Sequence, residues 1–278
     1  MKLITLKFTS PYSIGERENH IDAITLYRAL IKALTLLEEP FDEIKNGEVK
    51  FSSTFPVVNG KLYLKIPYRI VKCTDRDKEK MLKKIEYIDA DIFKKVSPPY
   101  TLECENDVGY LVGDGEKVKL DSNFLQSYGE SVVQYKNRMD RVNNSADIYS
   151  TSSFIPNTPV GFLATGWNNR LEKALKLLEK LGIGKDRNLG YGRFTVQEVK
   201  DIDLTLPNRE YKYVTGRAYT EGEYLSEKLE RAQIIGGDMD AVLHSILVLL
   251  PVGSLIKETK RIVLEKNNNI VIVDPIAL

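Results

Sequence analysis

Apolar positions near the amino terminus predict a strand followed by a helix. In residues 3–8 the set Leu3, Thr5 and Lys7 alternates with the apolar set Ile4, Leu6 and Phe8. This alternation is typical of a strand with one packed face, and Ser10-Pro11 ends the strand. From residue 21 to residue 37 apolar residues recur at spacings of three and four, the period of an amphipathic helix, and Pro40 closes it.

A β-hairpin is predicted next. Residues 51–58 and 61–67 flank Asn59-Gly60, a dipeptide that favours the two positive φ angles of a tight primed turn. Residues 75–95 are highly charged, which is typical of a solvated helix face or a mobile insertion. Residues 97–160 are rich in turn-forming residues, and we expect only short strand-like pieces there, at 102, 110–112 and 131–135.

Residues 168–181 give the clearest helical pattern in the chain. Leucine and alanine form one stripe while lysines lie outside it. Asn169 and Glu172 resemble a capping box at its start, and Gly182 occupies the position of a left-handed C-cap. Further strands are expected at 162–164, 193–199 and 211–217, with a mostly apolar segment at 241–250 and a hairpin at 261–266 and 270–274.

Strands and helices alternate, but the Asn-Gly turn and the three asparagines at 267–269 indicate antiparallel hairpins. We therefore predict an α+β chain of two ferredoxin-like (RRM-like, split-βαβ) domains with antiparallel sheets and long loop insertions, rather than a doubly wound parallel sheet. The larger domain would span residues 1–200. Residues 201–278 would form a smaller one, which can include strands from the 97–160 region.

Composition indicates a folded protein without a dominant charge. The chain has 278 residues, is 42% hydrophobic and 28% charged, and carries a formal charge of +1. Residues 130–193, however, hold 10 basic and 6 acidic side chains, a surplus of four. An anionic partner is therefore expected at that segment.

The cysteines and the apolar stretches exclude several classes. The two cysteines, Cys73 and Cys104, belong to no CxxC pair or His-rich cluster, so the sequence predicts neither a zinc site nor a disulfide scaffold, and no cofactor. The start alternates apolar and charged residues, unlike a signal peptide, and the longest apolar stretch, 241–256, is too short to span a bilayer. We expect a cytoplasmic protein without a membrane partner.

A glycine-rich loop at 182–194 is the most informative stretch. It joins a predicted helix to a predicted strand, and it combines glycines with cations and an aromatic ring: Gly182, Gly184, Lys185, Arg187, Gly190, Tyr191, Gly192 and Arg193. It is not a P-loop, because Lys185 is followed by Asp186, and it is not a dinucleotide motif, because the glycines follow the helix. It is interpreted as a cradle for a phosphodiester backbone, or alternatively as a tight turn with solvated charges.

A second basic cluster lies upstream, at residues 135–149. Cations and amides are interleaved there and flanked by Tyr135 and Tyr149; the candidate RNA-binding residues are Lys136, Arg138, Arg141 and Asn143. Such a segment can hold a single strand, although a solvated loop would have the same composition.

The two clusters together resemble the RAMP superfamily of CRISPR RNA-binding proteins. The carrying residues are Arg138-Met139-Asp140-Arg141, Asp147-Ile148-Tyr149 and the loop from Gly182 to Phe194. The amino terminus is similar to the fourth subunit of type III-A (Csm) effector complexes. This similarity lies in Leu6 to Pro11, His20 to Leu30 and Phe51 to Pro67. The similarity covers about the first 200 residues.

This resemblance implies two ferredoxin-like domains that bind the 5′ tag of the CRISPR RNA and cap one end of the filament. It also implies docking onto the large signature subunit and onto the adjacent backbone RAMP subunit. Residues 182–193 would touch the tag, and residues 136–144 would belong to the adjoining RNA-contacting insertion. Asp186, Asn188 and Leu189 depart from the family, which usually has further glycine or serine there.

A nuclease is the competing class. RNA cleavage without metal needs a general acid and base, and His20 with Tyr12, Tyr27 and Lys185 could provide them. His244 lies in an apolar run, and Asp238 and Asp240 lack a neighbouring histidine for a metal site. We expect a non-catalytic RNA-binding subunit, with a His20-dependent endoribonuclease and a pure assembly protein as the alternatives.

Overall fold

The structure is a computed structural model that describes residues 1–14, 19–66, 69–105, 108–140, 145–207, 210–226, 229–234, 245–266 and 269–278. A central sheet has the strand order β10-β6-β4-β3-β13-β1-β14, with β2 also paired to β13. Its strands are β1 (Lys2–Phe8), β2 (Lys50–Phe51), β3 (Phe55–Val58), β4 (Lys61–Lys65), β6 (Tyr87–Asp89), β10 (Phe124–Leu125), β13 (Val160–Thr165) and β14 (Phe194–Asp201).

The first strand, the first helix and the hairpin are confirmed, although the strand expected at 51–58 is interrupted at 52–54, between β2 and β3. The hairpin of β3 and β4 pairs Val58 with Lys61 across Asn59 and Gly60, whose φ angles are 50° and 76°. Helices α1 (Ala23–Leu36) and α5 (Asn169–Leu181) pack against each other, and α5 buries the predicted leucine and alanine stripe. The helix cap is one residue earlier than expected, because the Asn168 side chain accepts from the amides of Arg170 and Leu171.

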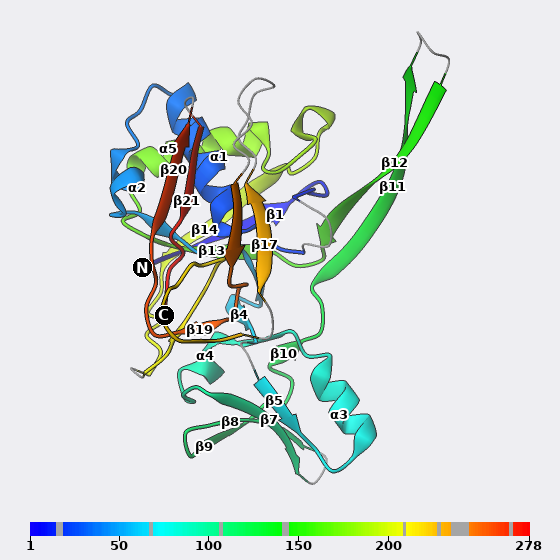
Figure 1. Cartoon of the computed structure of the whole chain (residues 1–278), viewed down its shortest axis with the longest axis vertical. Coiled ribbons are helices and arrows are strands. Elements are labelled where there is room, and N and C mark those ends of the chain that lie inside the picture. Colours follow the sequence, from blue (N-terminus) through cyan, green and yellow to red (C-terminus); the bar gives the residue numbers. More distant parts are fainter. Residues whose placement is uncertain are drawn as a thin grey trace.

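A second sheet, drawn at the foot of Figure 1, has the order β5-β7-β8-β9. Its strands are β5 (Arg69–Lys72), β7 (Tyr100–Glu105), β8 (Val108–Gly113) and β9 (Glu116–Lys119), and α3 (Arg76–Lys83) packs on β5 and β7. The charged segment 75–95 is thus only partly a solvated helix, since β6 and α4 (Ala90–Phe93) are largely buried. Among the pairings described, β5 with β7 is parallel and the others between named strands are antiparallel.

In the region 97–160 the prediction is right about the places of three strands and wrong about their length. The pieces expected at 102, 110–112 and 131–135 fall within β7, β8 and β11, but the region ends in the two longest strands described, β11 (Gly129–Asp140) and β12 (Ser145–Pro156), which pair in register along their whole length. They form a two-stranded ribbon that projects from the body in Figure 1. Because much of such a ribbon faces water on both sides, its sequence has no need of the alternating apolar pattern that marks a half-buried strand.

The carboxy-terminal part is all β in the residues described. It consists of the hairpin β20–β21, the pair β17–β18 and the sheet β15-β19-β16. Their bounds are β15 (Lys212–Tyr213), β16 (Tyr224–Leu225), β17 (Glu230–Ile234), β18 (Ser245–Leu249), β19 (Leu255–Ile256), β20 (Ile262–Lys266) and β21 (Asn269–Val273). The hairpin at 261–274 is confirmed, and the strand expected at 211–217 is much shorter.

The main core crosses residue 200. One buried cluster contains Leu3, Leu30 and Ile272. Asp274, whose side chain is 2% exposed, pairs with Lys50 at 2.9 Å and with Arg261 at 3.0 Å. The fold is therefore α+β with mostly antiparallel sheets, while the division at residue 200 and the two ferredoxin-like domains stay predictions.

Two further expectations concern cysteines and membranes. The chain carries a disulfide, Cys73–Cys104, that the spacing of the two cysteines did not predict. The two residues are 31 apart in the sequence, and the parallel pairing of β5 with β7 brings them together. No helix among the described residues is long and apolar enough to cross a membrane. Within the same residues no group of three His, Cys, Asp or Glu side chains is arranged to hold a metal ion.

Candidate RNA-binding surface

The glycine-rich loop is folded back against the chain segment that follows β1. The amide of Gly192 donates to the carbonyl of Pro11 at 2.7 Å, and the amide of Lys185 donates to that of Ser13 at 2.6 Å. Within the loop, the amide of Ile183 donates to the carbonyl of Gly192 at 2.9 Å. These bonds fix the loop at both edges, so its charged side chains start from a rigid base.

The four glycines of the loop divide into two roles. All have positive φ, between 70° and 102°. A Cβ atom at Gly182, Gly184 or Gly192 would lie 2.6, 2.5 or 1.9 Å from a carbonyl oxygen, so these three glycines let the backbone pack on itself and on Ser13. At Gly190 a Cβ would meet no atom within 4 Å. The close approach to a ligand that the sequence suggested for all four is therefore available at Gly190.

The loop's cations differ in exposure and are joined by an arginine that the sequence analysis missed. Lys185 and Arg193 are exposed, and Arg187 is half-buried. Arg28, on α1, is exposed, but neighbouring protein atoms partly desolvate its guanidinium group; this desolvation, chiefly, and the nearby charge of Arg187 lower its pKa. Two guanidinium groups held near each other favour an anion beside them. Arg28 escaped notice because it belongs to a helix 159 positions earlier, and only folding brings it to the loop.

The loop and the ribbon meet. The Tyr191 hydroxyl donates to Gln134 Oε1 on β11. The segment after β1, on which the loop packs, also pairs with β12. Tyr12 and Phe154 exchange main-chain hydrogen bonds of 3.0 and 2.8 Å, and Ser13 Oγ donates to the carbonyl of Ser152 at 2.8 Å. The structure thus joins the two basic clusters that the sequence analysis treated separately.

The ribbon positions of the upstream cluster can be assigned from its register. Lys136 and Arg138 follow Gln134 by two and four residues in β11, so these positions lie on the ribbon face that Gln134 occupies. Arg141 and Asn143 lie outside the described residues. These four, like the loop residues, stay predicted RNA contacts.

The opposite ribbon face exposes large apolar side chains. Val133, Tyr135 and Ile148 are 55%, 79% and 75% exposed. The pairing of Tyr135 with Ser150 and of Asn137 with Ile148 puts all three on one face. An exposed tyrosine beside aliphatic side chains can stack on a nucleobase or pack on protein.

The histidine considered for catalysis stands in a different environment. His20 is half-buried, with Nδ1 3.3 Å from Asn19 Oδ1. Two of its suggested partners are buried, which raises the pKa of both: the Tyr12 hydroxyl donates to the Asn19 carbonyl at 2.8 Å, and the Tyr27 hydroxyl donates to the Asp274 carbonyl at 2.7 Å. The third, Lys185, is exposed. Both tyrosine hydroxyls of the nuclease alternative are thus engaged with the main chain. His244, Asp238 and Asp240 lie outside the described residues.

A polar cleft of about 440 Å³ opens at the base of the ribbon. It lies between Lys65 of β4, the end of α3 at Lys83, Glu86, the start of β11 and the turn at 251–254. Its lining is mostly polar, which fits a hydrated contact better than an apolar ligand. Sequence reasoning offered no signal for it, because its walls come from distant segments.

Comparison with known proteins gives a result only at the level of structure. No family model matches the sequence. No curated protein matches it either. A chain of the Csm3–Csm4 subcomplex in the type III-A CRISPR-Cas interference complex aligns with 100% of this chain and 98% of its own, at 17% identity and a TM-score of 0.61.

Two other matches agree with the first. A chain of the Csm1–Csm4 cassette in complex with AMPPNP aligns over 100% of this chain and 95% of its own, at 17% identity and a TM-score of 0.56. A chain of the type III-B Cmr-beta complex bound to cognate target RNA and AMPPnP aligns over 92% and 86%, at 10% identity and a TM-score of 0.53. The chain therefore shares the fold of subunits of type III CRISPR effector complexes, and the resemblance seen in the sequence is confirmed at the level of the fold.

Proposed function

We propose that this chain is a non-catalytic, RNA-binding subunit of a type III-A CRISPR effector complex. It holds the repeat-derived 5′ tag of the CRISPR RNA, caps the complex, and lies beside the large signature subunit and the adjacent backbone subunit in the cytoplasm. The observation that carries the proposal is the junction of the glycine-rich loop with the ribbon through Tyr191 and Gln134. The shared fold with subunits of Csm complexes supports it.

In this proposal the first 200 residues form one split-βαβ unit. Strands β14, β1, β13 and β3 are adjacent in that order, α1 follows β1, and α5 connects β13 to β14. This is the arrangement in which a loop between the second helix and the last strand lies at a sheet end, where it can meet a ligand. The second unit would come from residues 201–278.

The surface suits a phosphodiester backbone. Arg187, Arg193 and Lys185 offer charge-assisted hydrogen bonds to phosphate oxygens, and the open space at Gly190 lets a backbone approach the loop. Arg28, on helix α1, adds a further cation near Arg187. Asp186 departs from the family, but its left-handed φ of 55° begins the 3-10 turn Arg187–Leu189, which gives it a role in shaping the loop.

Absence of cleavage is the second half of the proposal. The hydroxyls of Tyr12 and Tyr27 are engaged with main-chain carbonyls, which does not favour their use in general acid–base chemistry with His20. The alternative of a metal-independent endoribonuclease using His20 is kept as an outcome of the test below.

The test uses the full chain, alone and in its complex, with RNA that carries the tag. Tagged RNA should bind at least about tenfold more tightly than untagged RNA of the same length and should be recovered intact. Cleavage without added metal that the variant His20→Ala abolishes would overturn the non-catalytic assignment. Equal affinity for tagged and untagged RNA would contradict tag recognition.

A further inference from the structure

The two cysteines of this chain are placed opposite each other by strand register. β5 and β7 pair in parallel from Arg69 with Tyr100 to Lys72 with Glu103, and the next residues along each strand are Cys73 and Cys104. Their Cα atoms are 5.1 Å apart, within the usual range for a disulfide. Because the sheet itself positions the two sulfurs, they would stay near each other after reduction and could reoxidise.

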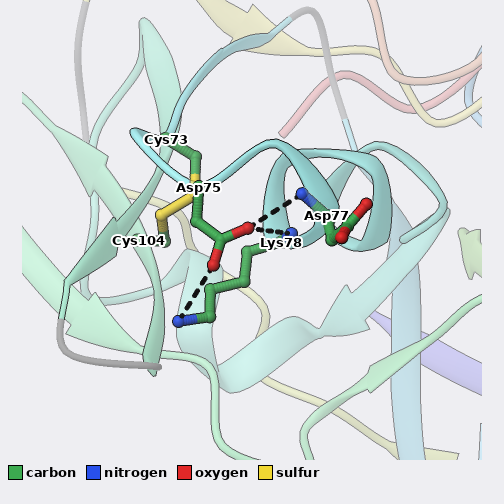
Figure 2. The surroundings of a disulfide bond; sticks show 5 residues. All are labelled: Cys73, Asp75, Asp77, Lys78 and Cys104. Atoms are coloured by element: carbon green, nitrogen blue, oxygen red, sulfur yellow. Dashed lines mark hydrogen bonds and ion pairs between the residues drawn. A yellow bond between two sulfur atoms is a disulfide. The ribbon is translucent and has the colours of Figure 1, made fainter.

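The bond adjoins the start of helix α3. Asp75, two residues after Cys73, caps the helix: its Oδ1 accepts from the amides of Asp77 at 2.9 Å and Lys78 at 3.3 Å, and its Oδ2 lies 3.5 Å from Lys78 Nζ (Figure 2). The hydrogen bonds from these two amides are the main reason why the pKa of Asp75 is lowered. The disulfide therefore fixes the turn from which the helix is capped.

The two ends of α3 are held differently. At the carboxyl end Leu82 is 1% exposed in the core. The amino end, exposed at Asp75 and Arg76, is held by the disulfide and by the Asp75 cap, while the helix as a whole contacts β5 and β7. The last residue, Lys83, lines the polar cleft together with Lys65 and Glu86. Of helix α3, only this last residue lines the cleft.

Cys73 and Cys104 are each half-buried, so neither residue is fully enclosed in the core. Disulfides in reducing compartments are usually transient or redox-sensing, whereas those of oxidising compartments are permanent crosslinks. In the reducing compartment of the proposed function, a partly accessible bond can exchange with small thiols.

We propose that Cys73–Cys104 is a reversible redox clamp that couples the thiol–disulfide state of the chain to the order of helix α3. A low-molecular-weight thiolate attacks one sulfur, forming a mixed disulfide and releasing the other cysteine as thiolate; a second thiol resolves the mixed disulfide. In sum, one protein disulfide and two small thiols give two cysteine thiols and one small disulfide. The proposal does not depend on RNA binding.

The experiment equilibrates the full chain in buffers of reduced and oxidised glutathione and counts thiols by alkylation and mass spectrometry. Hydrogen exchange is then measured for peptides covering residues 73–83 and, as reference, 194–201. We expect both thiols to appear together and reversibly, with exchange over 73–83 about tenfold faster after reduction and exchange over 194–201 unchanged. The variant Asp75→Ala should speed exchange over 73–83 in both redox states.

The double variant Cys73→Ser/Cys104→Ser should show the same hydrogen exchange over 73–83 as the reduced protein, and this exchange should not change with the glutathione ratio. Three results would overturn the clamp: a bond that reduced glutathione does not open, faster exchange over both peptides, or reduction without change over 73–83. The first would make the bond a permanent crosslink, the second would make it a support of the whole fold, and the third would separate it from α3. If the double variant does not fold, the reduction series on the natural chain still decides.

Discussion

The chain is expected to unfold cooperatively as the pH rises from about 10 to about 11. Burial raises the pKa of six tyrosines: Tyr12, Tyr27, Tyr87, Tyr100, Tyr128 and Tyr213. In the folded chain their hydroxyls stay protonated, while in the unfolded chain they ionise near pH 10. Their contribution to stability is therefore complete below pH 10 and is lost as the pH rises above it.

The expected effect is large. Each buried tyrosine lowers the free energy of unfolding by about 1.4 kcal/mol for every pH unit above 10. Six of them remove roughly 8 kcal/mol by pH 11, which is comparable with the whole stability of a typical domain, about 5–15 kcal/mol. Tyrosinate absorbance and circular dichroism should change together in one steep transition.

The matched variant is Tyr100→Phe, because burial is the cause of the shift at Tyr100. It should keep its stability at neutral pH and lose about one sixth of the alkaline slope. Tyrosinate absorbance that rises in full while the circular dichroism stays native would contradict the buried-tyrosine account.

Substitution of Gly192 by alanine is expected to disrupt the glycine-rich loop. A Cβ there would lie 1.9 Å from the Ile183 carbonyl oxygen, with φ at +70°. Backbone, not a flexible side chain, blocks the space, so the loop must move. We expect a loss of about 3 kcal/mol or more in denaturant unfolding, together with weaker binding of tagged RNA.

Gly190→Ala separates the two causes of strain. Its φ of +90° imposes the same conformational penalty, about 1 kcal/mol, but no atom lies within 4 Å of the new Cβ. Stability should therefore fall much less than in Gly192→Ala. Equal losses in the two variants would mean that the close contact at Gly192 does not hold the loop.

Elements that are determined by local sequence patterns could be predicted, and the others could not. The α5 helix and the β3–β4 hairpin were predicted because each follows from local spacing or from the Asn59-Gly60 turn. Of the ribbon β11–β12 only residues 131–135 were predicted as a strand, because exposed strands need no apolar alternation.

The candidate surface was predictable in its parts and not in its assembly. The loop cations and glycines stand together in the sequence, so residue type and spacing identify them. That Arg28 lies near Arg187, and that three of four glycines serve internal packing, depends on contacts between distant segments. The disulfide was missed for the same reason, since it depends on the register of β5 and β7.

The claim that the glycine-rich loop holds RNA phosphates is tested most directly by the salt dependence of binding. Affinity for tagged RNA is measured over a salt series for the natural chain, for Arg187→Ala/Arg193→Ala, and for a control of equal charge change on exposed α5 positions, Lys173→Ala/Lys176→Ala. The loop variant should bind more weakly and flatten the log–log slope by about 0.7 for each lost contact, while the control keeps the natural slope. An unchanged slope in the loop variant would contradict the account and favour a surface that contacts protein alone.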